Sequence, residues 1–155
     1  MITVDLLEPV PSKPEQSIDL IKKDLLPLYA EFWQKVAQPQ YDRPWNMHVA
    51  LFLELWFGGG LRCVIAKENG RAVGFAVCII FRPLQFEASV LQIHDMYAPD
   101  ANVECEMWQY IDNLAKILNC NELWIDKSCR LNHGTRLSRK WNRKAPTTIE
   151  RYVKE

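Results

Sequence analysis

His94 and Asp95 are adjacent residues whose side chains can do acid–base chemistry. An imidazole or a carboxylate can take a proton from an amine. Both residues lie in the strand-like run from Ala88 to Tyr97, where a two-residue period would turn them to opposite faces of a sheet. The alternative is structural: His94 hydrogen-bonds across the sheet, and Asp95 ends the strand or caps a neighbouring element.

Cysteine and histidine show no metal-binding pattern. The five cysteines form no C-x-x-C pair, and the three histidines do not fall at a zinc spacing. An odd number of scattered thiols is typical of a reducing compartment. We therefore expect a cytoplasmic protein without a metal site.

The composition is that of one soluble domain. The chain has 155 residues, of which 48% are hydrophobic and 25% are charged. No apolar run approaches the roughly 20 residues that cross a bilayer. The first residues, Met1 to Asp5, lack the basic flank and apolar block of a signal peptide. These features argue against a disordered chain, a disulfide-stabilised mini-protein and a membrane-spanning helix.

The net charge of zero divides unevenly along the chain. Residues 1–126 carry 10 basic and 17 acidic side chains, whereas residues 127–155 carry 9 basic and 2 acidic ones. The basic segment 130–144 suits a protein partner with an acidic patch, or it is a solvated face beside an acidic body. The neutral whole and the lack of a nucleic-acid-binding motif argue against a nucleic-acid partner.

Hydrophobic periodicity and turn residues predict the secondary structure. Strands are expected at 2–7, 61–67, 71–82, 88–97, 122–126 and 147–153, and helices at 17–36, 45–57, 103–118 and 133–144. Pro27 should kink or divide the first helix. The run 45–57 is apolar on nearly every side, so a buried strand is the alternative there. Helices and strands are mixed around an antiparallel middle, which predicts an α+β single domain.

This order of elements resembles the GNAT superfamily of N-acetyltransferases, which use acetyl-CoA. Three motifs carry the resemblance. Lys67-Glu-Asn-Gly-Arg-Ala-Val-Gly-Phe75 is similar to the family's second hairpin, Asp95-Met-Tyr-Ala-Pro-Asp100 to the end of its fourth strand, and Leu137-Ser-Arg-Lys-Trp141 with Thr147 to Lys154 to its closing helix and strand. The chain most resembles small phage-encoded GNAT-like proteins. The resemblance implies one domain over residues 1–155, with a mixed, mostly antiparallel sheet flanked by about four helices.

The resemblance also implies where acetyl-CoA would bind. The backbone of Met96, Tyr97 and Ala98 would hold the pantetheine arm, and Asn102, Val103 and Glu104 fall in the stretch that matches the pyrophosphate loop. That loop is normally Gln/Arg-x-x-Gly-x-Gly/Ala, whereas residues 100–108 contain no glycine and no basic residue. Glu104 and Glu106 suit a helix N-terminus without a ligand and would repel a diphosphate. A self-capped helix in place of a phosphate loop is therefore favoured.

The acid that protonates the leaving thiolate would also be unusual. Many members of the family use a tyrosine on the last helix, and Ser138 stands at the matching position. A serine hydroxyl is a far weaker acid than a phenol. Tyr110 or Tyr152 would take this role if the alignment is shifted by a turn.

Two functions follow from the sequence. The first is transfer of an acetyl group from acetyl-CoA to the amine of a small molecule or a protein. The second is a GNAT-fold protein that does not use the cofactor and acts by binding, for example as a phage virion or host-interaction component in the host cytoplasm or the virion. The resemblance favours the first function, and the missing loop favours the second.

Overall fold

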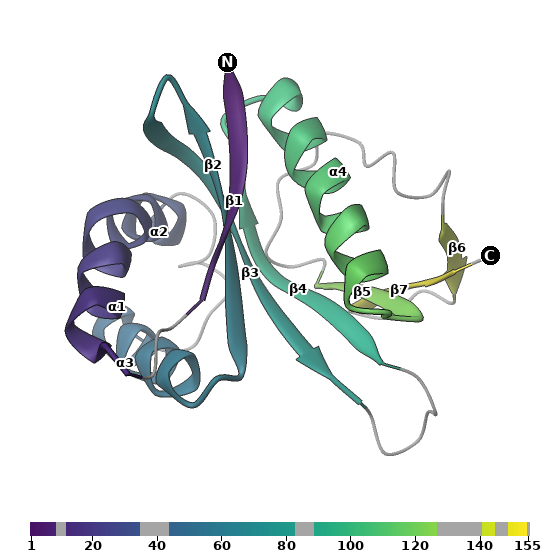
Figure 1. The fold of residues 1–155 in the computed structure, drawn as a ribbon, viewed down its shortest axis with the longest axis horizontal. Coiled ribbons are helices and arrows are strands. Elements are labelled where there is room, and N and C mark those ends of the chain that lie inside the picture. Colours follow the sequence, from purple (N-terminus) through teal and green to yellow (C-terminus); the bar gives the residue numbers. More distant parts are fainter. Residues whose placement is uncertain (9–11, 35–43, 83–88, 127–140, 145–148, 155) are drawn as a thin grey trace.

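The computed structural model describes residues 1–8, 12–34, 44–82, 89–126, 141–144 and 149–154. Its elements in chain order are β1 (Ile2–Leu7), α1 (Pro14–Leu20), the π-helix η1 (Ile21–Leu25), α2 (Leu26–Phe32), α3 (Trp45–Phe57), β2 (Leu61–Glu68), β3 (Arg71–Phe81), β4 (Val90–Tyr97), α4 (Ala101–Ile117), β5 (Glu122–Asp126), β6 (Trp141–Lys144) and β7 (Ile149–Lys154). Figure 1 shows these elements around one twisted sheet.

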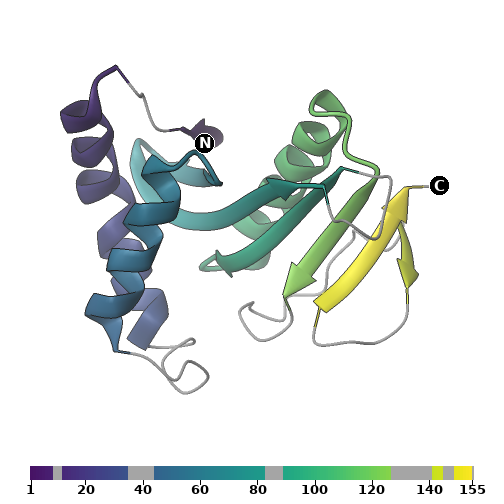
Figure 2. The same cartoon turned by 90° about the horizontal axis from the view of Figure 1, so that it is seen from below.

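The sheet has the strand order β1-β2-β3-β4-β5-β7-β6. Among the paired strands of the described residues, β4 and β5 are parallel and all the other neighbours are antiparallel. A parallel pair needs a long crossover, and α4 supplies it between β4 and β5. In Figure 2, β5 and β7 lie on the opposite side of β4 from helices α1 and α3.

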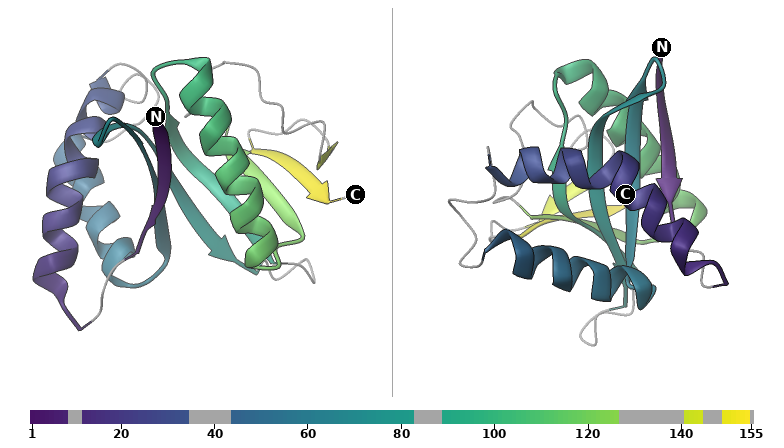
Figure 3. Two further views of the ribbon diagram at one scale, coloured as in Figure 1. Left: turned by 45° about the horizontal axis from the view of Figure 1, so that its top comes forward. Right: turned by 90° about the vertical axis from the view of Figure 1, so that its left-hand side faces the viewer.

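The helices form two layers, one on each face of the sheet (Figures 1 and 3). Alternate residues of β2 face two different cores. Val64 and Ala66 pack in the core under α4, whereas Cys63 and Ile65 pack in the core under α1–α3. The right-hand view of Figure 3 shows the α1–α2 segment and α3 side by side across the strands. Strand β2 is therefore buried on both faces.

Local sequence explains where most elements begin and end. Pro27 lies in the first turn of α2, directly after the π-turn Ile21–Leu25, so the first helix is divided where its sequence predicts. Asn69 and Gly70 have φ angles of 52° and 78° in the β2–β3 hairpin. The run 45–57 is a helix, as its main interpretation predicts, and Gly58 follows its last residue.

The α+β fold with a mixed, mostly antiparallel sheet is confirmed. One predicted element is wrong in part, because Trp141–Lys144 is a strand that pairs with β7 rather than the end of a basic helix. Its pairing with a regular neighbouring strand outweighs the helical propensity of a short basic stretch. The remainder of that predicted helix, 133–140, lies outside the described residues. None of the helices in the described part of the chain combines the length and the apolar character that crossing a membrane requires.

Candidate functional site

A β-bulge in β4 lies at His94. Val77 of β3 is paired with Asp95, whereas the next residue of β3, Cys78, is paired with Ile93. His94 is therefore the extra residue of β4, and the strand bends at this point. A bulge of this kind re-aims the side chains that follow it.

The bulge turns Asp95 away from the α4 layer. Ile93 and Met96 both pack in the core under α4, although they are three positions apart and simple alternation would put them on opposite faces. Asp95 instead contacts Tyr29 and His48, which come from α2 and α3. The inserted residue thus keeps a carboxyl group out of an apolar core and directs it to two polar partners.

Tyr29, His48 and Asp95 form a buried polar cluster. Asp95 has no exposed surface, and its Oδ2 accepts a hydrogen bond from the Tyr29 hydroxyl. The Tyr29 oxygen lies 2.7 Å from Nε2 of His48, and that Nε2 lies 3.8 Å from Oδ2 of Asp95. Because the hydroxyl has one hydrogen, which goes to Asp95, His48 donates through an Nε2–H. The cluster is a chain of donors from His48 through Tyr29 to Asp95.

Aromatic rings enclose this cluster. The His48 ring lies 4.6 Å from the Trp33 ring and 6.2 Å from the Trp45 ring, centroid to centroid, at interplanar angles of 34° and 26°. Tyr29 lies 4.8 Å from Phe75 of β3. The rings thus surround the cluster with apolar surface, and Tyr29, His48 and Asp95 are all buried.

Tyr97 lies on the same face of β4 as Asp95 and nearer to the surface. It is paired with Phe75 across the β3–β4 ladder, and its hydroxyl donates to Oε1 of Glu31 at 3.1 Å in a half-buried setting. Glu31 and Asp95 therefore place two carboxyl groups on the α1–α3 side of β4. Carboxyl groups in this position favour a cationic ligand over an anionic one.

The β4–β5 ladder is shorter than β4. It runs from the pair Val90–Glu122 to the pair Ile93–Ile125, directly before the bulge. β4 continues for four more residues, to Tyr97. Within the described residues β4 thus continues beyond β5, and a strand of this kind offers main-chain groups to an extended ligand. Met96 and Ala98, predicted to hold a pantetheine arm, lie in this region.

Gly74 allows α4 to pack closely against β3 and β4. A Cβ on Gly74 would lie 2.9 Å from the Tyr97 carbonyl oxygen, 3.1 Å from Sδ of Met107 and 3.3 Å from Cγ1 of Val103. Any larger residue would push the first turns of α4 off the sheet. The Val-Gly-Phe motif thus has a steric purpose: it fixes the N-terminus of α4 beside the end of β4.

Asp100 caps the N-terminus of α4. Its Oδ1 accepts hydrogen bonds from the amides of Asn102 at 2.9 Å and Val103 at 3.0 Å, and its carbonyl oxygen accepts from the amide of Glu104 at 3.1 Å. These are the amides that would otherwise point outward from the helix end. The helix is thus self-capped, and the capping carboxylate belongs to Asp100.

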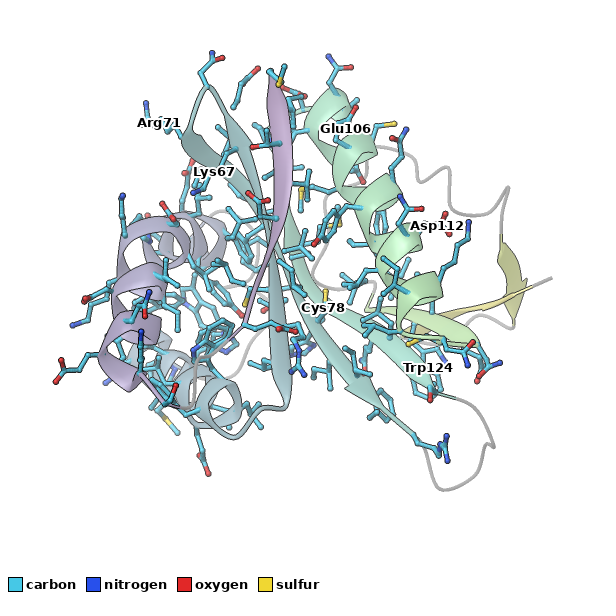
Figure 4. All side chains as sticks on the ribbon, viewed as in Figure 1. Lys67, Arg71, Cys78, Glu106, Asp112 and Trp124 are labelled. Atoms are coloured by element: carbon cyan, nitrogen blue, oxygen red, sulfur yellow. The ribbon has the colours of Figure 1, made fainter. Side chains whose placement is uncertain are left out.

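The two glutamates of the first turns lie apart from the cap. Glu104 is buried, and its Oε1 accepts a hydrogen bond from Nε1 of Trp108 at 3.1 Å. Glu106 is exposed near the N-terminal end of α4 (Figure 4). The sequence from 83 to 115 contains no lysine or arginine and six acidic residues. This stretch of the sequence therefore carries a net negative charge.

The three residues considered as the acid lie in different places. Ser138 is outside the described residues. Tyr110 of α4 lies beside β1, where burial and then the nearby carboxylates of Asp5 and Glu8 raise the pKa of its phenol. β1 is three strands from β4, about 14 Å at the usual strand spacing, so the fold does not bring Tyr110 to the end of β4. Tyr152 pairs with Leu123 through the β5–β7 ladder.

The buried cysteines are unsuited to nucleophilic chemistry. Burial raises the pKa of Cys78, from 9.0 to about 12. The pKa of Cys63 is raised as well, first by burial and then by the nearby Cys78 and Asp95. Figure 4 shows Cys78 between the sheet and α4. Both thiols remain protonated near neutral pH and act as small apolar side chains. Among the described residues, no group of three or more side chains could hold a metal ion.

Three residues of the site were not predicted as functional. Tyr29 falls in the apolar stripe of the first helix, and His48 is one of few polar residues in the run 45–57. A histidine in an otherwise apolar helix is the signal that could have indicated a buried polar partner. Asp100 directly precedes a helical period, which is an ordinary N-cap signal.

No protein-family model matches the sequence, and a search of curated proteins finds no match. Solved structures do match the fold. A putative acetyl transferase from Pyrococcus furiosus has a TM-score of 0.60 at 13% identity, covering 95% of this chain and 97% of that one. The polyamine N-acetyltransferase of Drosophila melanogaster has a TM-score of 0.56 at 11% identity, covering 97% and 99%. An aminoglycoside acetyltransferase from an uncultured soil metagenomic sample has a TM-score of 0.58 at 16% identity, covering 81% and 78%.

These similarities define the fold of the chain. Two of these solved structures are described as acetyltransferases and the third as a putative one, and the sequence identities are low enough that the similarity is one of fold. The chain therefore has the GNAT fold, with a mixed sheet between helical layers. The expected fold is confirmed.

Proposed function

We propose that this chain is an N-acyltransferase that acylates an amine from a thioester donor. The observation that carries the proposal is the end of the β4–β5 ladder at Ile93–Ile125, directly before the bulge at His94. The bulge gives β4 two chemically different sides at one point. The edge of β4 beyond the β4–β5 ladder offers main-chain groups to a donor. The face of β4 towards α1–α3 carries carboxyl groups that suit a cationic acceptor.

The donor side fits part of acetyl-CoA. The pantetheine arm is an extended chain with two amides, and it can add to the main chain of β4 at Met96 to Ala98 as an extra strand would. The diphosphate does not fit the N-terminus of α4, because Asp100 already accepts hydrogen bonds from the amides of Asn102 and Val103. When bound, a thioester supplies an activated acyl carbon. The chain's own contribution is to align it and to accept the acceptor's proton.

The acceptor side suits an amine. The carboxyl group of Glu31 lies half-buried on this side, and it would attract an ammonium group. The polyamine and aminoglycoside acetyltransferases with similar folds are named for substrates that carry several amines. A basic amine must lose a proton before it can attack a carbonyl carbon. The amine belongs to a small molecule or to a protein, and the reaction takes place in the cytoplasm.

His94 is the proposed proton acceptor. Its side chain is half-buried at the bulge, whereas Asp95 has no exposed surface and already accepts the Tyr29 hydroxyl hydrogen. Asp95 therefore acts as a positioning residue that fixes the bend of β4 through α2 and α3. Ser138 or Tyr152 would protonate the leaving thiolate.

A thiol-release assay tests this proposal. The full chain is incubated with acetyl-CoA and, in turn, a polyamine, an aminoglycoside and a lysine-containing peptide. We expect thiol release that depends on one of the amines, and a loss of about a hundredfold in kcat for His94→Gln. Gln92→Ala, on the same strand, is the matched control and should keep its rate. Absence of amine-dependent thiol release with every acceptor contradicts the proposal.

A second function is favoured by the capped helix. A GNAT-fold protein that does not use acetyl-CoA and acts by binding, for example as a phage virion or host-interaction component, has no need of free amides at the α4 N-terminus. Asp100 and the lack of basic residues from 83 to 115 support this alternative. Calorimetry separates the two functions: no binding of acetyl-CoA at millimolar concentration, together with no thiol release, supports the binding protein.

A further inference from the structure

The N-terminus of α4 holds a carboxylate of this chain where an anionic ligand would otherwise sit. Oδ1 of Asp100 accepts hydrogen bonds from the amides of Asn102 and Val103 at 2.9 and 3.0 Å. We infer that the protein takes its acyl donor without binding the donor's diphosphate, so that recognition rests on the thioester and the pantetheine arm. This inference rests on the proposed function and specifies its donor.

The connection between β4 and α4 offers no second set of amides. β4 ends at Tyr97 and α4 begins at Ala101, so three residues join them. Anion sites at helix ends need small residues that let successive amides approach the ligand. The sequence from 83 to 115 contains no glycine, and Asp100 itself has extended φ and ψ angles of −153° and 173°. The short link therefore leads directly into a capped helix.

Packing holds the first turn of α4 in this arrangement. Val103 is 1% exposed, and its Cγ1 would lie 3.3 Å from a Cβ at Gly74. The turn that carries the capped amides is thus fixed against β3. Releasing the amides requires a movement of the Asp100 side chain, because the helix itself is packed too closely to shift.

The charge around the helix end acts in the same direction. Asp100 and Glu106 contribute exposed carboxylates at or near the N-terminal turns of α4, and Glu104 is buried beside Trp108. No lysine or arginine occurs between Arg82 and Lys116. A diphosphate placed here would meet like charges at close range, and the sequence from 83 to 115 supplies no counter-charge of its own. Geometry and charge therefore both disfavour the nucleotide end of acetyl-CoA.

A comparison of two donors tests the inference. S-acetylpantetheine has the same thioester and arm as acetyl-CoA but lacks the nucleotide diphosphate. We expect kcat/KM for the two donors, with one amine acceptor, to agree within about threefold. Two charge-assisted hydrogen bonds to a diphosphate would favour acetyl-CoA by about a hundredfold. A preference for acetyl-CoA of about tenfold or more therefore overturns the inference and leaves the proposed function intact. Transfer from neither donor overturns both.

Variants of Asp100 identify the group responsible. Asp100→Ala removes the acceptor of both amides, so acetyl-CoA should gain about tenfold over S-acetylpantetheine. Glu106→Gln removes a nearby charge without freeing an amide, and it should change this ratio by less than about twofold. Asp100→Ser keeps an uncharged cap and checks that a change in the Ala variant does not come from unfolding. An unchanged ratio in the folded Ala variant contradicts the role given to Asp100.

Discussion

Replacing Tyr29 by phenylalanine tests the buried cluster that the bulge creates. The substitution removes one hydroxyl, which donates to Asp95 and accepts from His48, and leaves the aromatic packing in place. A hydrogen bond to a charged group contributes about 1.5–3 kcal/mol to stability. Asp95 has no exposed surface, so water cannot replace the lost donor at the native carboxyl. We expect the free energy of unfolding to fall by about 2.5 kcal/mol.

Urea unfolding at pH 7, followed by tryptophan fluorescence, measures this loss. For a chain of this length the change corresponds to a decrease in Tm of about 5–10 °C. Tyr97→Phe is the matched control, because it removes a hydroxyl that donates to Glu31 in a half-buried setting and should cost about 1 kcal/mol or less. In a double-mutant cycle, Tyr29→Phe and Asp95→Asn should show a coupling energy of about 1 kcal/mol or more. If Tyr29→Phe lowers the free energy of unfolding no more than Tyr97→Phe does, and the cycle shows no coupling energy, the stabilising role of the cluster is refuted.

Three further predictions follow from the packing and the cap. Burial raises the pKa of Cys78 to about 12, so the thiol contributes stability that is complete below pH 9 and is lost as pH rises towards 12. Unfolding free energies measured from pH 9 to 11 should therefore fall less steeply in Cys78→Ala, and equal slopes contradict this. Gly74→Ala should cost about 1–3 kcal/mol in urea unfolding, because its Cβ would lie 2.9 Å from a main-chain oxygen; unchanged stability contradicts the close packing of α4. Asp100→Ala should cost about 1 kcal/mol and Asp100→Ser much less, and equal losses in the two variants argue against a capping role.

The sequence allows most of the fold to be predicted because its local signals agree with one another. Asn69 and Gly70 accept positive φ angles, and the hairpin forms where they stand. Pro27 cannot donate a main-chain hydrogen bond, and the first helix is divided next to it. The stretch 141–144 differs because its strand character comes from pairing with β7, and a pairing partner cannot be seen in the strand's own four residues.

The site is harder to predict because it depends on an inserted residue. A period of two places His94 and Asp95 on opposite faces, but it does not reveal that one of them is the extra residue of a bulge. Because of the bulge, the Asp95 side chain contacts Tyr29 and His48, which lie 66 and 47 positions earlier in the chain. At α4 the expected self-capping is present, and the carboxylate that provides it is that of Asp100. Asp100 directly precedes the helical period, so the N-cap signal could have distinguished it from the other nearby carboxylates.

Main-chain amide shifts on addition of acetyl-CoA test the central claim most directly. In a two-dimensional ¹H–¹⁵N spectrum of the full chain, a donor bound through its pantetheine arm should shift the amides of Met96 and Ala98. The amides of Asn102 and Val103 should stay in place, because Asp100 remains their acceptor. Large shifts at Asn102 and Val103 would show that the diphosphate displaces Asp100. No shift at Met96 or Ala98 at millimolar acetyl-CoA would contradict the donor site itself.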